Sequence, residues 1–256
     1  MSPTSEDDLG RPVVVSAVVG RVVSLVPSLT EAVAVTAPGL LVGATDWCSH
    51  PVDLDVTRVR GTKNPDVQAV LDLRPDLVVA NAEENRESDL DALRAAGLAV
   101  WVTFPRTVPE ALTSLARMLA ACRLDRPGWL VEAAAAWDAP WEGPRRTALV
   151  PVWRRPWMAV GSGTFTGDVL ARLGVDNVLA DSPHRYPRIE LDRLPAYDLV
   201  VLPDEPYAFG PGDGPEAFAR PARCVSGRHL TWYGPSLAEA RTLLECQLAG
   251  TGGRSQ

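Results

Sequence analysis

Short apolar runs alternate with helical patterns along most of the chain. Runs rich in valine, such as residues 77–80 and 199–202, are continuously apolar over a short stretch. Such runs are typical of strands that are buried on both faces of a parallel sheet. Longer stretches between them carry apolar residues at helical spacing. The alternation predicts βα units, and therefore an α/β fold built on parallel sheets.

Two parts of this pattern occur twice. The tripeptide Leu25-Val26-Pro27 recurs as Leu149-Val150-Pro151, an offset of 124 residues (149 minus 25). Residues 76–83 resemble residues 198–205, an offset of 122 residues (198 minus 76). Because the repeats keep the same order at nearly the same offset, we infer two similar lobes. The acidic residue at the end of each repeated segment then lies where open α/β sheets place their ligand crevice.

Helix signals agree with this layout. Residues 28–31 and 236–239 have the sequence of capping boxes, and Asn64-Pro65 has that of an N-cap followed by proline at the first helical position. The alanine-rich residues 125–137 predict one helix between the lobes. A single helical link permits modest rocking of the lobes. We predict an N-terminal extension (residues 1–20), an N-terminal α/β lobe (21–123), a connecting helix (124–144) and a C-terminal α/β lobe (145–256).

Polar and aromatic clusters follow the predicted strands of both lobes. Four of the eight tryptophans lie in these clusters, and a flat, partly polar ligand would suit walls of this kind. An alternative stays open for each position, namely an ordinary aromatic at the edge of the core or a solvated loop charge. The candidate ligand-binding residues are Trp47, Cys48, His50, Lys63, Asn64, Glu83, Glu84, Arg86, Phe104, Trp153, Arg154, Trp157, Glu205, Tyr207, Trp232 and Tyr233.

Two of these residues, Cys48 and His50, carry metal-binding groups. They lie two positions apart in a predicted loop, so a thiolate or an imidazole could coordinate a metal there. Two ligands without a third make a poor site for a free ion, so we expect them to act only on a metal that arrives already chelated. Lys63 is the only lysine among 25 basic residues. It could contact an anionic group of the ligand, and a solvated side chain is the alternative.

Charge and motifs narrow the range of functions. A net charge of -7 and a pI near 5.1 argue against a nucleic-acid partner, since phosphate binding needs a concentrated basic surface. The sequence has no Gly-x-Ser-x-Gly, His-Glu-x-x-His, Walker loop or Gly-x-Gly-x-x-Gly after a strand, so we expect no enzyme. Glu83 and Glu205 could imitate the paired carboxylates of a glycosidase, but symmetric acids in a duplicated protein fit binding equally well.

Cysteine usage and the first residues bear on the compartment. The four cysteines are scattered without a C-x-x-C spacing, which fits reduced thiols. The chain starts with an acidic segment that lacks a basic region followed by an apolar run. No stretch approaches the roughly 20 apolar residues of a membrane span. These observations predict a cytoplasmic protein without a transmembrane segment.

Several segments together resemble a known family. The family is the cobalamin-binding branch of the helical-backbone metal receptors. Its opening strand and helix are similar to residues 21–31, and its most typical segment is similar to residues 61–65 followed by 73–80. Residues 153–158, 203–207 and 230–234 extend the resemblance into the second lobe. The resemblance implies two Rossmann-like lobes joined by a single backbone helix. It also implies a corrinoid or similar metal chelate held in a cleft between the lobes, without covalent chemistry.

The sequence departs from this family in three respects. Secreted members carry an export signal or lipid anchor, and they dock on an ABC permease through an acidic residue on each lobe. The matching positions here are Gln68 and Glu190, and the connector is shorter than usual. We therefore expect a cytoplasmic binding protein for cobalamin or a related metal chelate, with Cys48 or His50 as an axial ligand. The alternatives are the substrate-binding component of an ABC importer of cobalamin or iron chelates, and an enzyme or accessory protein built on this fold.

Overall fold

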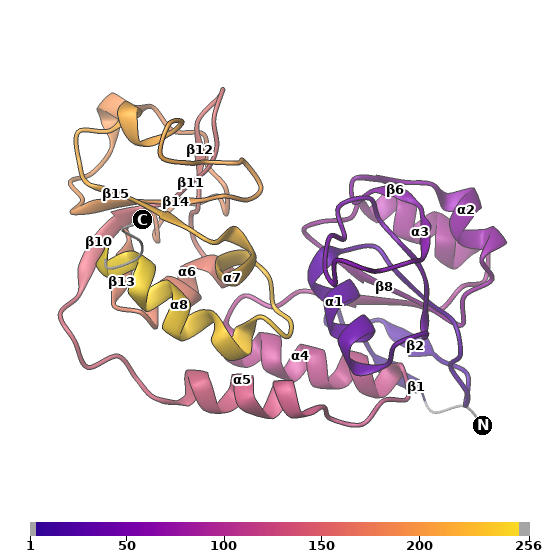
Figure 1. The fold of residues 1–256 in the computed structure, drawn as a ribbon. Coiled ribbons are helices and arrows are strands. Elements are labelled where there is room, and N and C mark those ends of the chain that lie inside the picture. Colours follow the sequence, from indigo (N-terminus) through magenta and orange to yellow (C-terminus); the bar gives the residue numbers. More distant parts are fainter. Residues whose placement is uncertain (1–3, 251–256) are drawn as a thin grey trace. The chain divides into compact units, whose positions relative to one another are not determined.

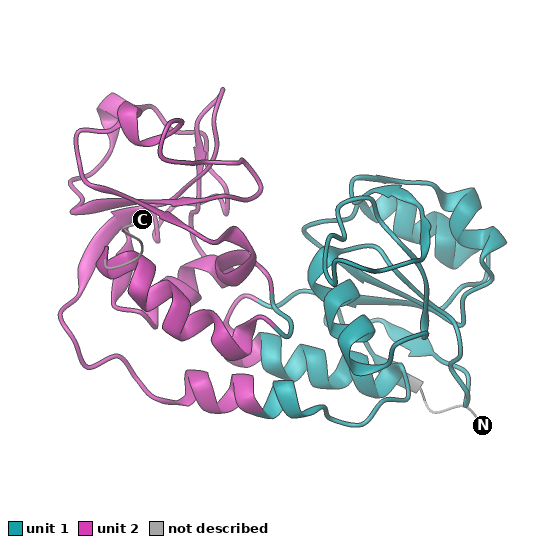
Figure 2. Cartoon of the chain, in the orientation of Figure 1, with its two compact units in different colours: residues 1–105, 111–131, 233–235 teal, residues 106–110, 132–232, 236–256 magenta. Residues whose placement is uncertain are grey.

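The computed structural model describes residues 4–250, which fold as two compact units (Figures 1 and 2). Unit 1 comprises residues 1–105, 111–131 and 233–235, and unit 2 comprises residues 106–110, 132–232 and 236–256. The chain passes between the units just before and again within helix α4 (Val108–Ala121), then in helix α5 (Gly128–Asp138) and on both sides of residues 233–235. The predicted helix between the lobes is α5, and α4 and residues 233–235 also contain unit boundaries.

Unit 1 contains one parallel sheet of five strands. In spatial order these are β5 (Thr57–Arg58), β4 (Leu41–Ala44), β3 (Val22–Ser24), β8 (Leu77–Asn81) and β9 (Val100–Thr103). The remaining helices of the unit are α1 (Pro27–Thr36), α2 (Val67–Asp72) and α3 (Glu87–Ala95), and β6 (Arg60–Gly61) pairs with β7 (Asn64–Pro65). All five residues of β8 are buried, as expected for a central parallel strand.

The predicted N-terminal extension forms part of unit 1. Within the described residues, β1 (Thr4–Glu6) and β2 (Pro12–Val14) make an antiparallel hairpin. Asp8, in the turn of this hairpin, accepts hydrogen bonds from Ser114 Oγ at 2.5 Å and from Arg117 Nη1 at 2.9 Å. Its backbone N–H also donates to the carbonyl oxygen of Val102 at 3.0 Å. These bonds attach the hairpin to α4 and to the edge strand β9. The predicted domain boundaries otherwise stay a prediction.

Unit 2 contains a parallel sheet of four strands. In spatial order these are β13 (Val175–Asn177), β10 (Arg146–Leu149), β14 (Leu199–Pro203) and β15 (Ala222–Val225). An antiparallel hairpin of β11 (Pro151–Trp153) and β12 (Met158–Ala159) follows β10. The helical elements are α6 (Phe165–Ala171), η1 (Leu191–Arg193), η2 (Pro215–Ala217), α7 (Gly227–Thr231) and α8 (Leu237–Ala249).

The two sheets repeat one strand order, which confirms the predicted two-lobed α/β fold. The order β4-β3-β8-β9 in unit 1 corresponds to β13-β10-β14-β15 in unit 2. The repeated segments found in the sequence give β3 and β8 in one sheet and β10 and β14 in the other. Each pair lies side by side in parallel, with Val22 opposite Leu77 and Ala148 opposite Leu199. The repeats diverge after the first strand, since Pro27 begins helix α1 whereas Pro151 begins the β11–β12 hairpin.

Two of the three predicted helix starts are wrong, and the third lacks the predicted capping bond. Helix α1 begins at Pro27, so Ser28 lies inside the helix and is not its cap. Asn64 and Pro65 form strand β7, and the N-cap of α2 is Asp66, whose carboxylate accepts from the backbone N–H of Ala69 at 3.1 Å. Ser236 is the N-cap of α8 but makes no side-chain capping bond. In the first two cases the local pattern suits a helix start, but tertiary contacts override it.

No helix within residues 4–250 has both the length and the apolar character needed to cross a bilayer.

Candidate ligand-binding site

Loops after three strands of unit 1 meet at the carboxyl-end edge of its sheet. The ammonium group of Lys63, in the turn between β6 and β7, donates to the carbonyl oxygen of Glu83, in the loop after β8. The side-chain amide of Asn85 donates to the carbonyl oxygen of Thr62 at 2.9 Å and to that of Leu25 at 3.2 Å. The loop after β8 is therefore fastened to the loop after β3 and to the β6–β7 turn.

Trp47 and Asn64 gather around Gly61 in the same region. A Cβ atom on Gly61 would lie 2.6 Å from Asn64 Oδ1 and 3.3 Å from Trp47 Nε1. Glycine is therefore needed for the close approach of these two side chains. The indole of Trp47 is 68% exposed, which is unusual for so large an apolar group. The structure thus brings together four of the candidate residues, Trp47, Lys63, Asn64 and Glu83, and their contact with a ligand stays a prediction.

A buried polar network holds these loops from beneath. Asn81 Oδ1 accepts from the backbone N–H groups of Glu83 at 2.7 Å and Glu84 at 3.0 Å. Asn81 Nδ2 donates to the carbonyl oxygen of Thr103 at 3.0 Å and to the hydroxyl of Tyr233 at 2.6 Å. The backbone N–H of Asn81 donates to Asn85 Oδ1 at 2.9 Å. Sequence reasoning missed both asparagines, although their spacing of four residues after a predicted strand was a usable signal.

Tyr233 belongs to this network and not to the exposed surface. Its hydroxyl lies 2.8 Å from Thr103 Oγ1, whose own proton is directed to the carbonyl oxygen of Ala80 at 3.0 Å. The Tyr233 hydroxyl is therefore the donor to Thr103. Burial raises the pKa of Tyr233, so the hydroxyl stays protonated. The side chain supports the loop after β8 in unit 1.

The two predicted metal-binding residues have different surroundings. Cys48 is buried, and its Sγ lies 3.0 Å from Thr30 Oγ1 and 3.1 Å from Thr45 Oγ1. Burial raises the pKa of this thiol, which disfavours the thiolate that binds metals. His50 is half-buried, with Nδ1 3.1 Å from Ser49 Oγ. Within the described part of the chain, no group of three or more His, Cys, Asp or Glu residues could hold a metal ion.

The remaining candidate ligand-binding residues of unit 1 are Glu84, Arg86 and Phe104. Glu84 and Arg86 are exposed in and after the loop that follows β8, where Arg86 is the N-cap residue of α3. Phe104 is half-buried directly after β9, and its backbone N–H donates to Asp8 Oδ2 at 2.9 Å.

In unit 2, the predicted aromatics form one cluster after β10 and β14. Trp153 meets Tyr207 edge-on, with ring centroids 5.6 Å apart, and Trp157 stacks on Phe209 at 5.9 Å with an interplanar angle of 3°. Tyr207 lies 4.6 Å from Phe209, and Trp157 meets Phe218 at 5.2 Å. Trp153 is 43% exposed at the margin of the cluster. The two phenylalanines were missed because they lie in a Gly- and Pro-rich segment that resembles a plain loop.

Arg154 fastens this cluster to the segment after Tyr207. Its guanidinium lies 5.2 Å from the ring centroid of Trp157, pairs with Glu216 at 2.7 Å and also pairs with Asp213. The hydroxyl of Tyr207 donates to Asp213 Oδ2 at 2.6 Å. This hydrogen bond and the guanidinium lower the pKa of Asp213, so its carboxylate stays charged. Arg154 is thus part of a local ion-pair network that orders the β11–β12 hairpin.

Glu205 and Trp232 are directly bonded to each other in unit 2. Trp232 Nε1 donates to Glu205 Oε2 at 2.9 Å, and the indole is only 7% exposed. The backbone N–H of Gly227 donates to Asp204 Oδ1 at 2.5 Å. A Cβ on Gly227 would lie 2.6 Å from the backbone nitrogen of Glu205. The loop after β14 is therefore held closely against the start of α7, and Trp232 orients Glu205 from the interior.

The chain is similar in sequence and in fold to proteins that bind vitamin B12. No protein-family model matches the chain. The chain is 27% identical over 184 residues to the vitamin B12-binding protein of Salmonella choleraesuis, and the match covers 68% of each chain. It also resembles the solved periplasmic vitamin B12-binding protein BtuF of Vibrio cholerae, with a TM-score of 0.72 and 16% identity over 92% of this chain and 99% of that chain. These similarities support the predicted resemblance to the helical-backbone metal receptor superfamily.

A second solved structure has a fold similar to that of this chain. The periplasmic heme-binding protein BhuT, in complex with two hemes, gives a TM-score of 0.69 and 22% identity over 90% of this chain and 98% of that chain. These relatives are named for binding and not for catalysis, which at the level of the family agrees with the prediction that the protein is not an enzyme. The predicted cytoplasmic location is wrong, because these similar solved proteins are periplasmic binding proteins.

Proposed function

We propose that this protein is the substrate-binding component of an importer, acts outside the cytoplasm, and binds cobalamin or a related planar metal chelate such as heme. The proposal is supported chiefly by the aromatic side chains at the carboxyl-end edge of each parallel sheet, in a chain with vitamin B12-binding relatives. Flat chelates present wide apolar faces, and indole rings match such faces in shape and polarity.

Trp47 is the proposed contact of unit 1. An indole buries about 200 Å² when it is fully covered. If the ligand covers about half of the 68% that is exposed, roughly 70 Å² is removed from water. At about 25 cal/mol per Å², this contributes about 1.7 kcal/mol, which is about twentyfold in Kd. Lys63, fixed by its bond to Glu83 in the same region, is placed to meet an anionic group of the ligand.

Trp153 and Tyr207 are the proposed contacts of unit 2. Their rings meet edge-on, and the ion pairs of Arg154 with Asp213 and Glu216 fix the hairpin that carries Trp153. Preorganised side chains lose little rotamer freedom on binding, which favours affinity. Glu205, oriented by Trp232, is the proposed polar contact at the same edge.

The chemistry expected of this protein is reversible binding. Cys48 is excluded from the proposed contacts because its thiol is buried and hydrogen-bonded. His50 remains the proposed protein ligand to the metal of the chelate, since an imidazole nitrogen is a common metal ligand. A permease partner is also proposed. Glu190, in an exposed ion pair with Arg193 at 2.9 Å, is its candidate contact in unit 2, and Gln68 on α2 stands at the other position.

An absorbance titration of the purified protein with cyanocobalamin and with hemin tests this function. We expect saturable binding of at least one chelate, and a Kd about twenty times higher for Trp47→Ala. For Trp153→Ala, whose side chain is 43% exposed, the same reasoning gives a Kd about six times higher. Val131→Ala is the control, because Val131 is an exposed apolar residue of α5, outside these loops. Binding of neither chelate would refute the proposed function. Binding that both tryptophan variants retain at full strength would refute the proposed contacts.

A further inference from the structure

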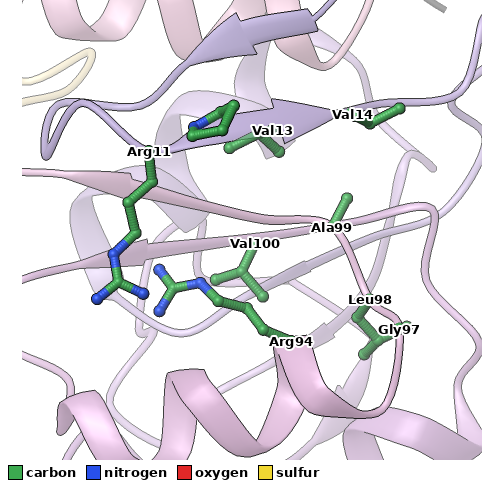
Figure 3. Close-up of a pocket in the computed structure, with 9 residues that line it drawn as sticks. Arg11, Val13, Val14, Arg94, Gly97, Leu98, Ala99 and Val100 are labelled. Carbon is green, nitrogen blue, oxygen red and sulfur yellow. The ribbon is translucent and has the colours of Figure 1, made fainter.

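A second pocket in unit 1 lies apart from the proposed chelate contacts. It has a volume of about 390 Å³ and is lined by β2 and by residues 97–100, which lead into the start of β9. Arg11 and Arg94 stand at one end, and Val13, Leu98 and Val100 line the rest (Figure 3). The pocket therefore adjoins the amino end of β9, whereas the chelate contacts follow the carboxyl ends of the strands. Its volume is within the range of small-molecule sites.

The two guanidinium groups lie next to each other in Figure 3 and share one carboxylate. Asp91 Oδ1 lies 3.3 Å from Arg11 Nη1 and 2.8 Å from Arg94 Nη1, and Glu87 pairs with Arg11 Nη2 at 2.7 Å. Both carboxylates are more than half exposed, so water and salt screen their charge. The positive charge of Arg11 and Arg94 is thus balanced only by carboxylates that face the solvent.

One donor at this end has no acceptor. Arg94 Nη2 is buried and makes no hydrogen bond to any of the described residues. A buried donor without a partner is costly, and native structures satisfy nearly all such groups. An acceptor supplied by a ligand in the pocket would remove this cost.

The open edge of β9 supplies a further polar group. Asp8 covers this edge at Val102, where its N–H bonds the carbonyl oxygen at 3.0 Å. The carbonyl oxygen of Ala99 instead accepts from Val78 on the neighbouring strand β8. Residues two apart on a strand present their backbone groups to the same side. Val100 therefore presents its backbone to the edge that Val102 shares with Asp8, on the side of the pocket.

We propose that this pocket binds a small monocarboxylate with a short, branched apolar chain. The carboxylate accepts from Arg94 Nη2 at the cationic end, and the chain packs against Val13, Leu98 and Val100. A single negative charge fits better than a phosphate dianion, because Asp91 and Glu87 lie at the same end of the pocket and would repel a dianion more strongly. The apolar wall excludes strongly hydrated anions such as sulfate. This site does not depend on the proposed chelate-binding function.

Methyl resonances of protein labelled at valine and leucine locate such binding directly. Titration with 3-methylbutanoate is expected to give saturable shifts at Val13, Val14, Leu98 and Val100. The amide of the same shape, 3-methylbutanamide, is expected to bind at least tenfold more weakly, since a charge-assisted hydrogen bond is stronger than a neutral one. Equal binding of acid and amide, or shifts that do not include these methyl groups, would overturn the proposal.

Two variants and a control connect the site to the guanidinium groups. Arg94→Met is expected to weaken 3-methylbutanoate binding at least tenfold. Arg11→Met, at a half-exposed position, is expected to weaken it less and serves if Arg94→Met does not fold. Arg145→Met is the matched control, because Arg145 makes a similarly exposed ion pair with Asp176 in unit 2. Wild-type affinity in either folded arginine variant of the pocket would refute the site, whatever the chelate titration shows.

Discussion

Replacing Tyr233 with phenylalanine tests the buried network that supports the loops of unit 1. The substitution keeps the ring and removes one oxygen atom. That oxygen accepts from Asn81 Nδ2 at 2.6 Å and donates to Thr103 Oγ1 at 2.8 Å. Thr103 keeps its own bond to the carbonyl oxygen of Ala80, whereas Asn81 loses one acceptor in a site that is 4% exposed.

The expected loss of stability follows from this one orphaned donor. A buried polar group without a partner costs about 1–3 kcal/mol, so we expect Tyr233→Phe to lower the free energy of unfolding by about 2 kcal/mol. Urea denaturation followed by circular dichroism measures it. With a slope of about 2–3 kcal/mol per M, the midpoint for unit 1 falls by roughly 0.7–1 M while the slope stays the same. Amides of residues 83 and 84 are expected to exchange faster, because Asn81 holds both of them.

Tyr197→Phe provides the comparison. Tyr197 is half-buried against the Val200, Leu202 and Phe209 cluster of unit 2, and its hydroxyl has no hydrogen bond within the described part of the structure. Its loss should therefore change the unfolding free energy by less than about 0.5 kcal/mol. If Tyr233→Phe lowered the unfolding free energy as little as Tyr197→Phe, the hydrogen bonds of the Tyr233 hydroxyl would not stabilise unit 1 as we infer.

Two further predictions concern thiols and a glycine. Iodoacetamide should alkylate the exposed thiols of the native protein and should reach the buried thiols only when the protein unfolds. The thiolate is the form that reacts, and burial raises the pKa of a thiol, to about 12 for Cys122. Mass spectrometry should find Cys224 and Cys246 modified and Cys48 and Cys122 protected; early modification of Cys48 would contradict its placement. Gly61→Ala should weaken chelate binding by displacing Asn64 and Trp47, whereas Gly212→Ala, with open space around it, should not; equal affinities in the titration would refute this reading.

The strands and the duplication could be predicted because they depend on local patterns. Buried parallel strands need continuous apolar runs, and residues 76–83 and 198–205 show them at nearly the offset of the first repeat. The structure pairs these strands with β3 and β10 in equivalent places. Helix starts were harder to predict, because Asn64-Pro65 suits a cap in isolation but pairs as strand β7 in the folded chain.

The sequence indicated which types of residue follow the strands, but it did not indicate which of their side chains are exposed. Trp47 and Tyr233 were equal candidates in the sequence, yet one is 68% exposed and the other 7%. Cys48 lies beside an exposed tryptophan but points into the core, where Thr30 and Thr45 contact its sulfur. Only tertiary packing decides such differences, and no local pattern records it. The location of the protein was mispredicted from its first residues, and its relatives corrected it.

Hydrogen exchange with and without saturating chelate is the most direct test of where the ligand binds. We predict slower exchange in residues 45–50, 60–65 and 83–86 of unit 1 and in residues 152–158 and 204–209 of unit 2, which follow the carboxyl ends of the strands. Protection absent from these loops, or confined to other segments such as residues 94–100, would contradict it.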